Sequence, residues 1–247
     1  MNQALEQAAQ YLVTARRNGA APRLAEENRP LDLDSALAIQ SRVGELLGES
    51  IGGWKCSAPS GDRIVVAPIW RSFIHSGPKC PALSGSIEPE IAFVMAQDLP
   101  PRDRPYSEEE VRAAIGETRL VLELIGSRYQ QPKEASFLEK LADSASNQGL
   151  YLGPVVEGGP THGMSHFPIV IESRGKNIFE VEGKHPDGHP PVPLLWLANF
   201  LPSKGQHLRA GEVVTTGSYA GVIEVPTGDQ LRVVFGNFGA IDVLLAT

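Results

Sequence analysis

The sequence has little cysteine and no long apolar run. Only two cysteines, Cys56 and Cys80, occur in 247 residues, which excludes a disulfide framework and fits a reducing compartment. No stretch approaches the roughly 18 uninterrupted apolar residues of a membrane-spanning helix. The first residues lack the basic start and the apolar core of a secretion signal. We therefore expect a cytoplasmic protein.

The sequence also lacks an excess of positive charge. The net charge is -7 and the pI is about 5.4, which argues against a partner that is nucleic acid or an anionic membrane. The hydrophobic fraction of 42% in a chain of this length is enough to bury a substantial core. These values predict one large domain, or one domain with a helical appendage.

Three glutamates stand inside apolar, strand-like runs. Glu88 and Glu90 lie within residues 87–95, and Glu123 lies within residues 120–125. In a strand, residues i and i+2 point to the same face, and an unpaired buried carboxylate costs several kcal/mol or more. If the second strand brings Glu123 to the face of the first two, three carboxylates converge. Oxygen ligands of this kind suit Mg²⁺ or Mn²⁺.

The pattern alone leaves other interpretations open for these glutamates. Glu88 and Glu90 could lie on the wet face of a half-exposed strand. Glu123 has apolar neighbours on both sides. Instead of binding a metal, it could form a buried salt bridge to Arg119 or Arg128.

The periodicity of the sequence changes near residue 50. Before it, apolar residues recur at helical spacing, and Asp32 or Asp34 can cap a second helix that Gly48 stops. After it, short apolar runs alternate with Gly and Pro, which is typical of strands and turns. Further helices are predicted after the capping box at Ser107 and near residues 193–201. The expected strands are 51–56, 63–67, 87–95, 119–125, 150–156, 168–173, 176–181, 212–216, 220–224, 229–234 and 240–245. The pattern predicts an α+β protein with a helical segment at 1–50 and a β-rich body at 51–247 that is one continuous domain.

Several motifs in the same order resemble one known family. They are Glu88-Pro89-Glu90-Ile91-Ala92-Phe93-Val94 with Asp98-Leu99-Pro100, Leu122-Glu123-Leu124 with Ser127-Arg128, Gly53-Trp54-Lys55, and the segments 141–149 and 208–218. Together they resemble the 2-keto-4-pentenoate hydratase and 2-oxo-hepta-3-ene-1,7-dioate hydratase family within the fumarylacetoacetate hydrolase superfamily. The resemblance implies the β-rich mixed-sheet body of the fumarylacetoacetate hydrolase C-terminal type.

The resemblance also implies the parts of a site. It implies Mg²⁺ or Mn²⁺ held by Glu88, Glu90 and Glu123, and a substrate whose 2-oxo or 2-enol carboxylate head binds that metal. Lys55 and Asp143 are then the catalytic candidates that manage proton transfer. Burial of Lys55 near the metal is expected to lower its pKa.

Ser146, Asn147 and Ser218 are the candidates for binding the substrate carboxylate. Each could equally be a turn residue. Asp143 could be a helix or turn cap, and Lys55 could be a strand-end lysine that reaches water.

The expected function is a metal-dependent hydratase, a carbon–oxygen lyase. It would add water to a 2-hydroxy-2,4-dienoate or 2-oxo-enoate in the catabolism of aromatic ring-cleavage products. Family hydratases carry an Asp-Tyr/Phe-Gly segment that is absent here: residues 67–75 hold no aspartate. Decarboxylation of a 2-oxo-enedioate of the 4-oxalocrotonate type is therefore an alternative, as are C–C hydrolysis of an acylpyruvate and non-catalytic binding of 2-oxo acids. The apolar N-terminal helices favour a homo-oligomer.

Overall fold

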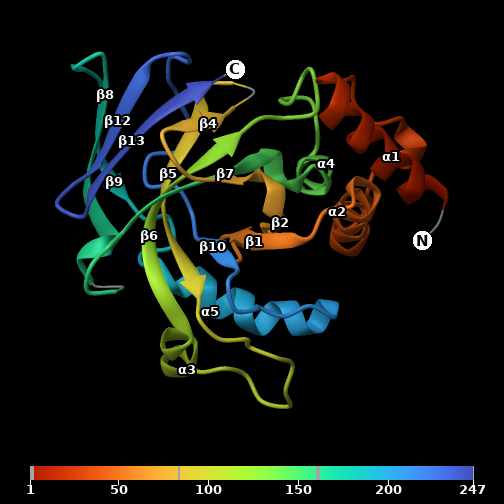
Figure 1. Cartoon of the computed structure of the whole chain (residues 1–247). Coiled ribbons are helices and arrows are strands. Elements are labelled where there is room, and N and C mark those ends of the chain that lie inside the picture. The colour runs from red at the N-terminus through yellow and green to blue at the C-terminus, as the bar shows by residue number, and fades with distance from the viewer. Residues whose placement is uncertain (1–2, 83, 160–161, 247) are drawn as a thin grey trace.

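A large mixed β-sheet forms the centre of the molecule (Figure 1). The computed structural model describes residues 3–82, 84–159 and 162–246. Parallel and antiparallel pairs occur in the eight-stranded sheet. Its strands, in spatial order, are β2 (Val66–Trp70), β1 (Ile51–Cys56), β10 (Val213–Thr215), β5 (Ser86–Met95), β6 (Ile115–Ile125), β7 (Asn147–Val155) and β3 (Ile74–His75), with β11 (Ile223–Glu224) paired to β5.

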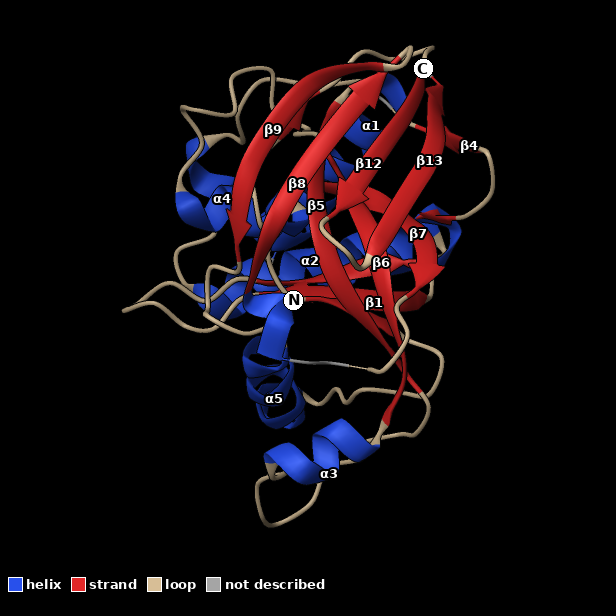
Figure 2. Ribbon diagram, turned by 90° about the vertical axis from the view of Figure 1, so that its left-hand side faces the viewer, coloured by secondary structure: helices blue, strands red, loops and turns tan. Residues whose placement is uncertain are grey.

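A second, five-stranded sheet covers one face of the first. Figure 2 shows its long strands side by side. In order they are β4 (Lys79–Pro81), β13 (Gly239–Ala246), β12 (Gln230–Phe235), β8 (His166–Ser173) and β9 (Lys176–Lys184). Phe93 and Leu122 of the large sheet share one buried cluster with Ile169 and Val233 of the second sheet. The main core therefore lies between the sheets, and a smaller apolar cluster that includes Ala92 and Val121 lies on the other face of β5 and β6.

The helices lie around the sheets. They are α1 (Gln3–Asn18), α2 (Leu33–Leu47), α3 (Glu108–Ala113), α4 (Phe137–Ala142) and α5 (Pro191–Phe200), with 3₁₀ turns η1 (Glu26–Asn28), η2 (Arg71–Phe73), η3 (Ser144–Ser146), η4 (His162–Ser165) and η5 (Leu201–Lys204). The helix α2 begins at the Asp32 capping box and ends at Gly48 in the left-handed conformation. The capping box of Ser107 and Glu110 begins α3. These caps confirm the predicted starts.

The predicted α+β class is confirmed, but the short strands β3 and β4 were not predicted, and the strand expected at 220–224 is reduced to β11. The helix α4 was not predicted, although Ser136 and Glu139 form a capping box at its start like the one that begins α3. The strand expected at 63–67 is wrong in its bounds, since β2 covers Val66–Trp70. It includes Pro68, which a strand accepts here because β2 is at the edge of the sheet.

The N-terminal helices share a second core with a later part of the chain. Residues of α1 and α2 form one buried cluster with Tyr129, Ala135 and Leu141, and Figure 1 shows α4 beside α2. The buried side chain of Gln40 joins these parts, since its Nε2 donates to the carbonyls of Val66 and Leu141. The division at residue 50 stays a prediction, although the packing ties the helices to the segment that precedes β7.

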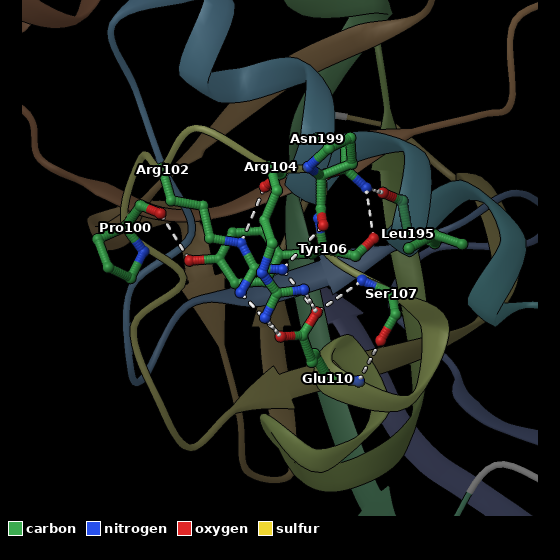
Figure 3. Close-up of polar contacts among 9 residues, drawn as sticks. Pro100, Arg102, Arg104, Tyr106, Ser107, Glu110, Leu195 and Asn199 are labelled. Carbon is green, nitrogen blue, oxygen red and sulfur yellow. Dashed lines mark hydrogen bonds and ion pairs between the residues drawn. The ribbon is translucent and has the colours of Figure 1, made fainter.

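A polar cluster fixes the loop between β5 and α3 (Figure 3). Glu110 accepts hydrogen bonds from Arg102, Arg104 and the backbone of Ser107. The Arg102 guanidinium lies 3.5 Å from the centroid of the Tyr106 ring. Asn199 of α5 bonds both backbone groups of Tyr106. The loop thereby joins α3 to α5.

The contacts of Gln40 generate a stability prediction. Gln40→Met removes the amide and leaves two carbonyls without a partner in a buried place, so we expect the free energy of unfolding to fall by about 1–3 kcal/mol. Urea unfolding followed by circular dichroism measures this change. The matched control is Gln10→Met on the exposed face of α1, for which we expect a change below about 0.5 kcal/mol. Equal effects of the two substitutions would contradict the role given to Gln40.

Candidate metal centre

The register of β5 against β6 brings three carboxylates together. Glu88 lies directly opposite Glu123, and Glu90 lies opposite Val121, so all three glutamates share one face of the sheet. One carboxylate oxygen from each lies within 4.8 Å of the other two. Glu90 and Glu123 are buried, at 2% and 0% exposure, and Glu88 is partly exposed. The interpretation as a wet strand face is therefore wrong for Glu90, whereas Glu88 lies at the partly exposed end of the group.

The electrostatics of this trio fit a divalent cation. Burial, followed by the charges of Glu123 and Glu88, raises the pKa of Glu90 well above its usual value. Burial also raises the pKa of Glu88, against the opposing effect of Lys55. The Oε2 atom of Glu123 is buried and has no hydrogen-bond partner among the described residues. Within that part of the chain, this oxygen accepts no hydrogen bond, and it lies beside two more carboxylates. Mg²⁺ or Mn²⁺ could take all three carboxylates as ligands.

Lys55 is the cation that contacts this trio. Its Nζ lies 2.6 Å from Oε1 of Glu123 and donates to the carbonyl of Ala145 at 3.3 Å. Gly53 permits the close approach of β1 and β10 at this place, because a Cβ there would meet the Val213 carbonyl oxygen at 2.2 Å. Lys55 is therefore not the strand-end lysine that reaches water.

Burial and the three carboxylates shift the pKa of Lys55 in opposite directions. Burial lowers this pKa, but the charges of Glu123 and Glu88 outweigh burial, so the pKa is raised above its usual value. The three carboxylates by themselves favour the ammonium form, and the lowering expected of Lys55 beside a bound metal stays a prediction.

The alternative partners of Glu123 have other contacts. Arg119 pairs with Glu117, and Arg128 pairs with Asp143. A buried salt bridge from Glu123 to either arginine is therefore excluded by the structure.

Cys56, the residue after Lys55, is buried in the main core. It therefore lies on the opposite face of β1 from Lys55.

Asp143 lies at the start of a strained turn. Ser144, Ala145 and Ser146 have φ values of 53°, 50° and 63°, a left-handed conformation that costs about 1–2 kcal/mol per residue without glycine. Arg128 stabilises the turn: its side chain donates to the Asp143 carboxylate and to backbone carbonyls on both sides of the turn. The Arg128 backbone N–H donates to the other oxygen of Asp143. Both oxygens of Asp143 thus bond Arg128, and the described contacts do not join Asp143 to Lys55.

The predicted substrate-binding residues divide into two groups. Asn147 joins the trio, since its Nδ2 donates to Oε1 of Glu123 at 2.8 Å. Ser146 belongs to the strained turn, where its carbonyl accepts from Gly126. The Ser218 hydroxyl instead bonds Gly221 and Ala220 within its own turn. The substrate contacts expected of these residues stay predictions.

Two residues of the site were not found from the sequence. The backbone N–H of Gly217 donates to Oε2 of Glu90 at 2.9 Å, and Gly217 adopts a φ of +121° that favours glycine. The glycine after Thr215-Thr216 was a signal that could have indicated this bond. Arg128 was considered only as a partner of Glu123, and its role in the turn depends on a contact that spacing does not show.

The strand beside Lys55 lacks an acidic group. Ala67 of β2 lies directly opposite Lys55. Trp70 projects to the other face, where its ring packs against Gly44 of α2. The face of β2 next to Lys55 is thus apolar, as the missing aspartate at 67–75 indicates.

Solved structures establish the fold. A 4-oxalocrotonate decarboxylase from Pseudomonas putida, solved with calcium and acetate, superposes with a TM-score of 0.79 over 99% of this chain and 98% of that chain, at 20% identity. The 2-hydroxyhepta-2,4-diene-1,7-dioate isomerase from Mycobacterium marinum gives a TM-score of 0.54 over 80% of this chain and 76% of that chain, at 15% identity. At these identities the likeness shows the fold alone. It is the fold of the fumarylacetoacetate hydrolase superfamily, as predicted.

The chain is similar in sequence to hydratases and to decarboxylases. The 2-keto-4-pentenoate hydratase of Paraburkholderia xenovorans is 27% identical over 155 residues, 63% of this chain and 56% of that protein. The 2-hydroxyhexa-2,4-dienoate hydratase of Comamonas testosteroni is 27% identical over 65% of this chain and 61% of that protein. A 4-oxalocrotonate decarboxylase from a Pseudomonas strain is 29% identical over 60% of this chain and 54% of that protein. The chain thus matches little more than half of the length of these curated relatives.

The predicted resemblance to the hydratase family is confirmed by these relatives. No family model matches the chain. Among the described residues, no helix is long and apolar enough to cross a membrane.

The trio generates a prediction about metal binding. A cation must displace protons that the raised pKa of Glu90 retains, so we expect Mg²⁺ affinity to increase as the pH rises above the usual glutamate pKa of about 4.3. Calorimetric titration at several pH values, in buffers of different ionisation enthalpy, measures the affinity and the released protons. Glu123→Gln should abolish binding, whereas Glu117→Gln on the same strand should not. Binding that is independent of pH would count against the trio as the site.

Proposed function

We propose that the protein is a divalent-metal-dependent hydratase that adds water to a 2-hydroxy-2,4-dienoate or 2-oxo-enoate from aromatic ring cleavage. The observation that carries this proposal is the contact of the Lys55 ammonium with Glu123 inside a group of three converging carboxylates. Sequence similarity to hydratases that act on such acids supports the choice of substrate class. Magnesium in the structure of a similar decarboxylase supports the choice of cation.

Charge balance supports a divalent ion at this place. Three ionised carboxylates and one ammonium leave two uncompensated negative charges, which one Mg²⁺ or Mn²⁺ would neutralise. Glu88, Glu90 and Glu123 would hold the ion. When bound, the ion would supply a Lewis acid for the 2-oxo carboxylate head of the substrate.

Lys55 is the candidate proton carrier. Its ammonium loses the full attraction of Glu123 once that carboxylate is shared with a cation. Burial then dominates, which brings the pKa of the lysine toward the range useful for proton transfer. The Ala145 carbonyl, at 3.3 Å from Nζ, holds the ammonium in place. Lys55 can thus hold a proton beside the three carboxylates and pass it to the carbon skeleton of the substrate.

The strained turn is the candidate site for the substrate carboxylate. Ser146 and Asn147 follow Ala145, whose carbonyl bonds Lys55, so they lie within two residues of a group that contacts the lysine. Asp143 is proposed to act through Arg128 and the turn, because both of its oxygens bond Arg128. Ser218 is proposed as a further substrate contact from the segment next to Gly217, which bonds Glu90.

A specific observation favours a second reaction on the same site. Ala67 stands opposite Lys55 where the sequence lacks an acid, and decarboxylation of a 2-oxo-enedioate needs no group that activates water. Two 4-oxalocrotonate decarboxylases are among the relatives. Acylpyruvate hydrolysis and non-catalytic binding of 2-oxo acids are the remaining alternatives.

The full proposal includes Mn²⁺ as an alternative ion, a cytoplasmic location and a homo-oligomer.

An ultraviolet assay of the purified protein tests these proposals. We expect turnover of a 2-hydroxydienoate with Mg²⁺ and loss of turnover with EDTA. Parallel assays with a 2-oxo-enedioate and an acylpyruvate separate the reactions, and product NMR distinguishes hydration from release of CO₂. Turnover that EDTA does not change would refute the metal mechanism. Binding of 2-oxo acids without turnover of any substrate would favour the non-catalytic alternative.

The role of Lys55 has its own test. Lys55→Met removes the proton carrier, so we expect kcat to fall by about 10²- to 10⁴-fold, with a smaller change in KM. Thermal unfolding with Mg²⁺ present checks that the variant folds. Lys79→Met, on the exposed part of β4, is the control and should leave kcat unchanged. A Lys55→Met variant with the wild-type kcat would exclude proton transfer by Lys55.

A further inference from the structure

A cavity of about 430 Å³ lies beside the C-terminal end of α1. Figure 1 shows this end of α1 close to the loop that follows β6, and an isolated bridge joins Ala21 to Tyr129 there. The volume is that of a site for a small organic molecule. Six of the residues that line it are Arg16, Phe73, Leu124, Ser127, Arg128 and Gln148.

The charge of the lining is one-sided. Two arginines, Arg16 and Arg128, line the cavity, and no aspartate or glutamate of the described chain does so. The Asp143 carboxylate is the nearby counter-charge, but both of its oxygens already bond Arg128. One guanidinium is therefore left without a carboxylate, in a protein whose net charge is -7.

Arg16 is the guanidinium that remains uncompensated. Within the described chain, its side chain makes one hydrogen bond, from Nη2 to the Ser144 hydroxyl at 3.3 Å. Its Nε is buried and has no partner among the described residues. Burial, followed by the like charge of Arg128, lowers the pKa of Arg16 to about 9 against the effect of Asp143, so Arg16 stays charged at neutral pH. Arg16 is partly buried, and a cation in such a place without a directly bonded carboxylate is costly, a cost that a bound anion would reduce.

The cavity is separate from the candidate metal centre. Leu124 lines the cavity, whereas the preceding residue, Glu123, belongs to the carboxylate trio. Successive residues of a strand point to opposite faces, so β6 lies between the two places. A substrate held by the trio cannot extend through the sheet, which means that any occupant of the cavity is a second molecule.

We propose that this cavity binds a small organic monocarboxylate, whose carboxylate pairs with Arg16 and whose apolar body lies against Phe73 and Leu124. An arginine fork matches the geometry of a carboxylate, and Ser127 and Gln148 offer further polar groups. Arg16 also donates to the hydroxyl of Ser144, the first residue of the strained turn. The ligand would therefore contact a side chain that is bonded to the turn beside Lys55. This site does not depend on the proposed reaction.

Benzoate is a suitable probe, and benzamide is its uncharged counterpart. Titrations by ligand-observed NMR use metal-free protein, in which the three carboxylates repel anions. We expect saturable binding of benzoate and none of benzamide. Arg16→Met should weaken benzoate binding at least about tenfold, the equivalent of about 1.4 kcal/mol. Arg16→Lys keeps the charge and should retain part of the affinity, whereas Arg17→Met, an exposed neighbour on α1, should bind as the wild type does.

Thermal unfolding gives a second readout. Benzoate should raise the melting temperature of the wild type and of Arg17→Met, but not that of Arg16→Met. Without ligand, Arg16→Met should melt at or above the wild-type temperature, because it removes a partly buried charge that no carboxylate bonds directly. The proposal is overturned if benzoate does not bind, if benzamide binds equally well, or if Arg16→Met binds benzoate with wild-type affinity. The comparison of the two probes on the wild type needs no variant to fold.

Discussion

Glu88 and Glu123 face each other across two hydrogen-bonded strands, and this cross-strand pair places like charges where little water reaches. A slip of β6 by one residue against β5 would turn Glu123 toward the main core and its apolar neighbours toward the site. The register is fixed because Ile91, Phe93 and Leu122 must face the second sheet. The hydrophobic core thus holds three mutually repelling groups together, and Lys55 offsets only part of the repulsion.

The strained turn at 144–146 is, after the three converging carboxylates, the second feature that costs folding free energy. It lies next to those carboxylates. Its left-handed residues are stabilised by the several hydrogen bonds of Arg128. The turn presents the Ala145 carbonyl to Lys55 and the Asn147 amide to Glu123. Local strain of this kind persists where the surrounding structure over-determines it, and it is common at functional sites. The packing of α1, α2 and α4 supplies that support from the side away from the sheet.

Much of the trio could be predicted from the sequence, because Glu88 and Glu90 have the i, i+2 spacing that a strand converts into a shared face. The contact of Lys55 with Glu123 needed the family resemblance, since the two residues lie on strands that do not adjoin. The environment of Asp143 could not be predicted. The motif indicated a free acid, whereas its partner Arg128 becomes visible only when the loop after β6 folds against the turn. The bounds of β2 were missed because Pro68 looks like a breaker, although an edge strand accepts it.

The alanine opposite Lys55 also bears on the reaction. An aspartate in this place would add a fourth carboxylate to a group in which the pKa values of Glu88 and Glu90 are already raised, and it would compete with Glu123 for the ammonium. With Ala67 there, Lys55 is directed to Glu123 and to the turn. A single proton carrier next to the head of the substrate is enough to form and protonate an enol. Addition of water farther along the substrate needs a second group that orients the water, and β2 does not provide one next to Lys55. The hydratase and decarboxylase proposals therefore share the residues that would bind the 2-oxo carboxylate head of the substrate. They differ in whether a further group near Lys55 orients a water molecule.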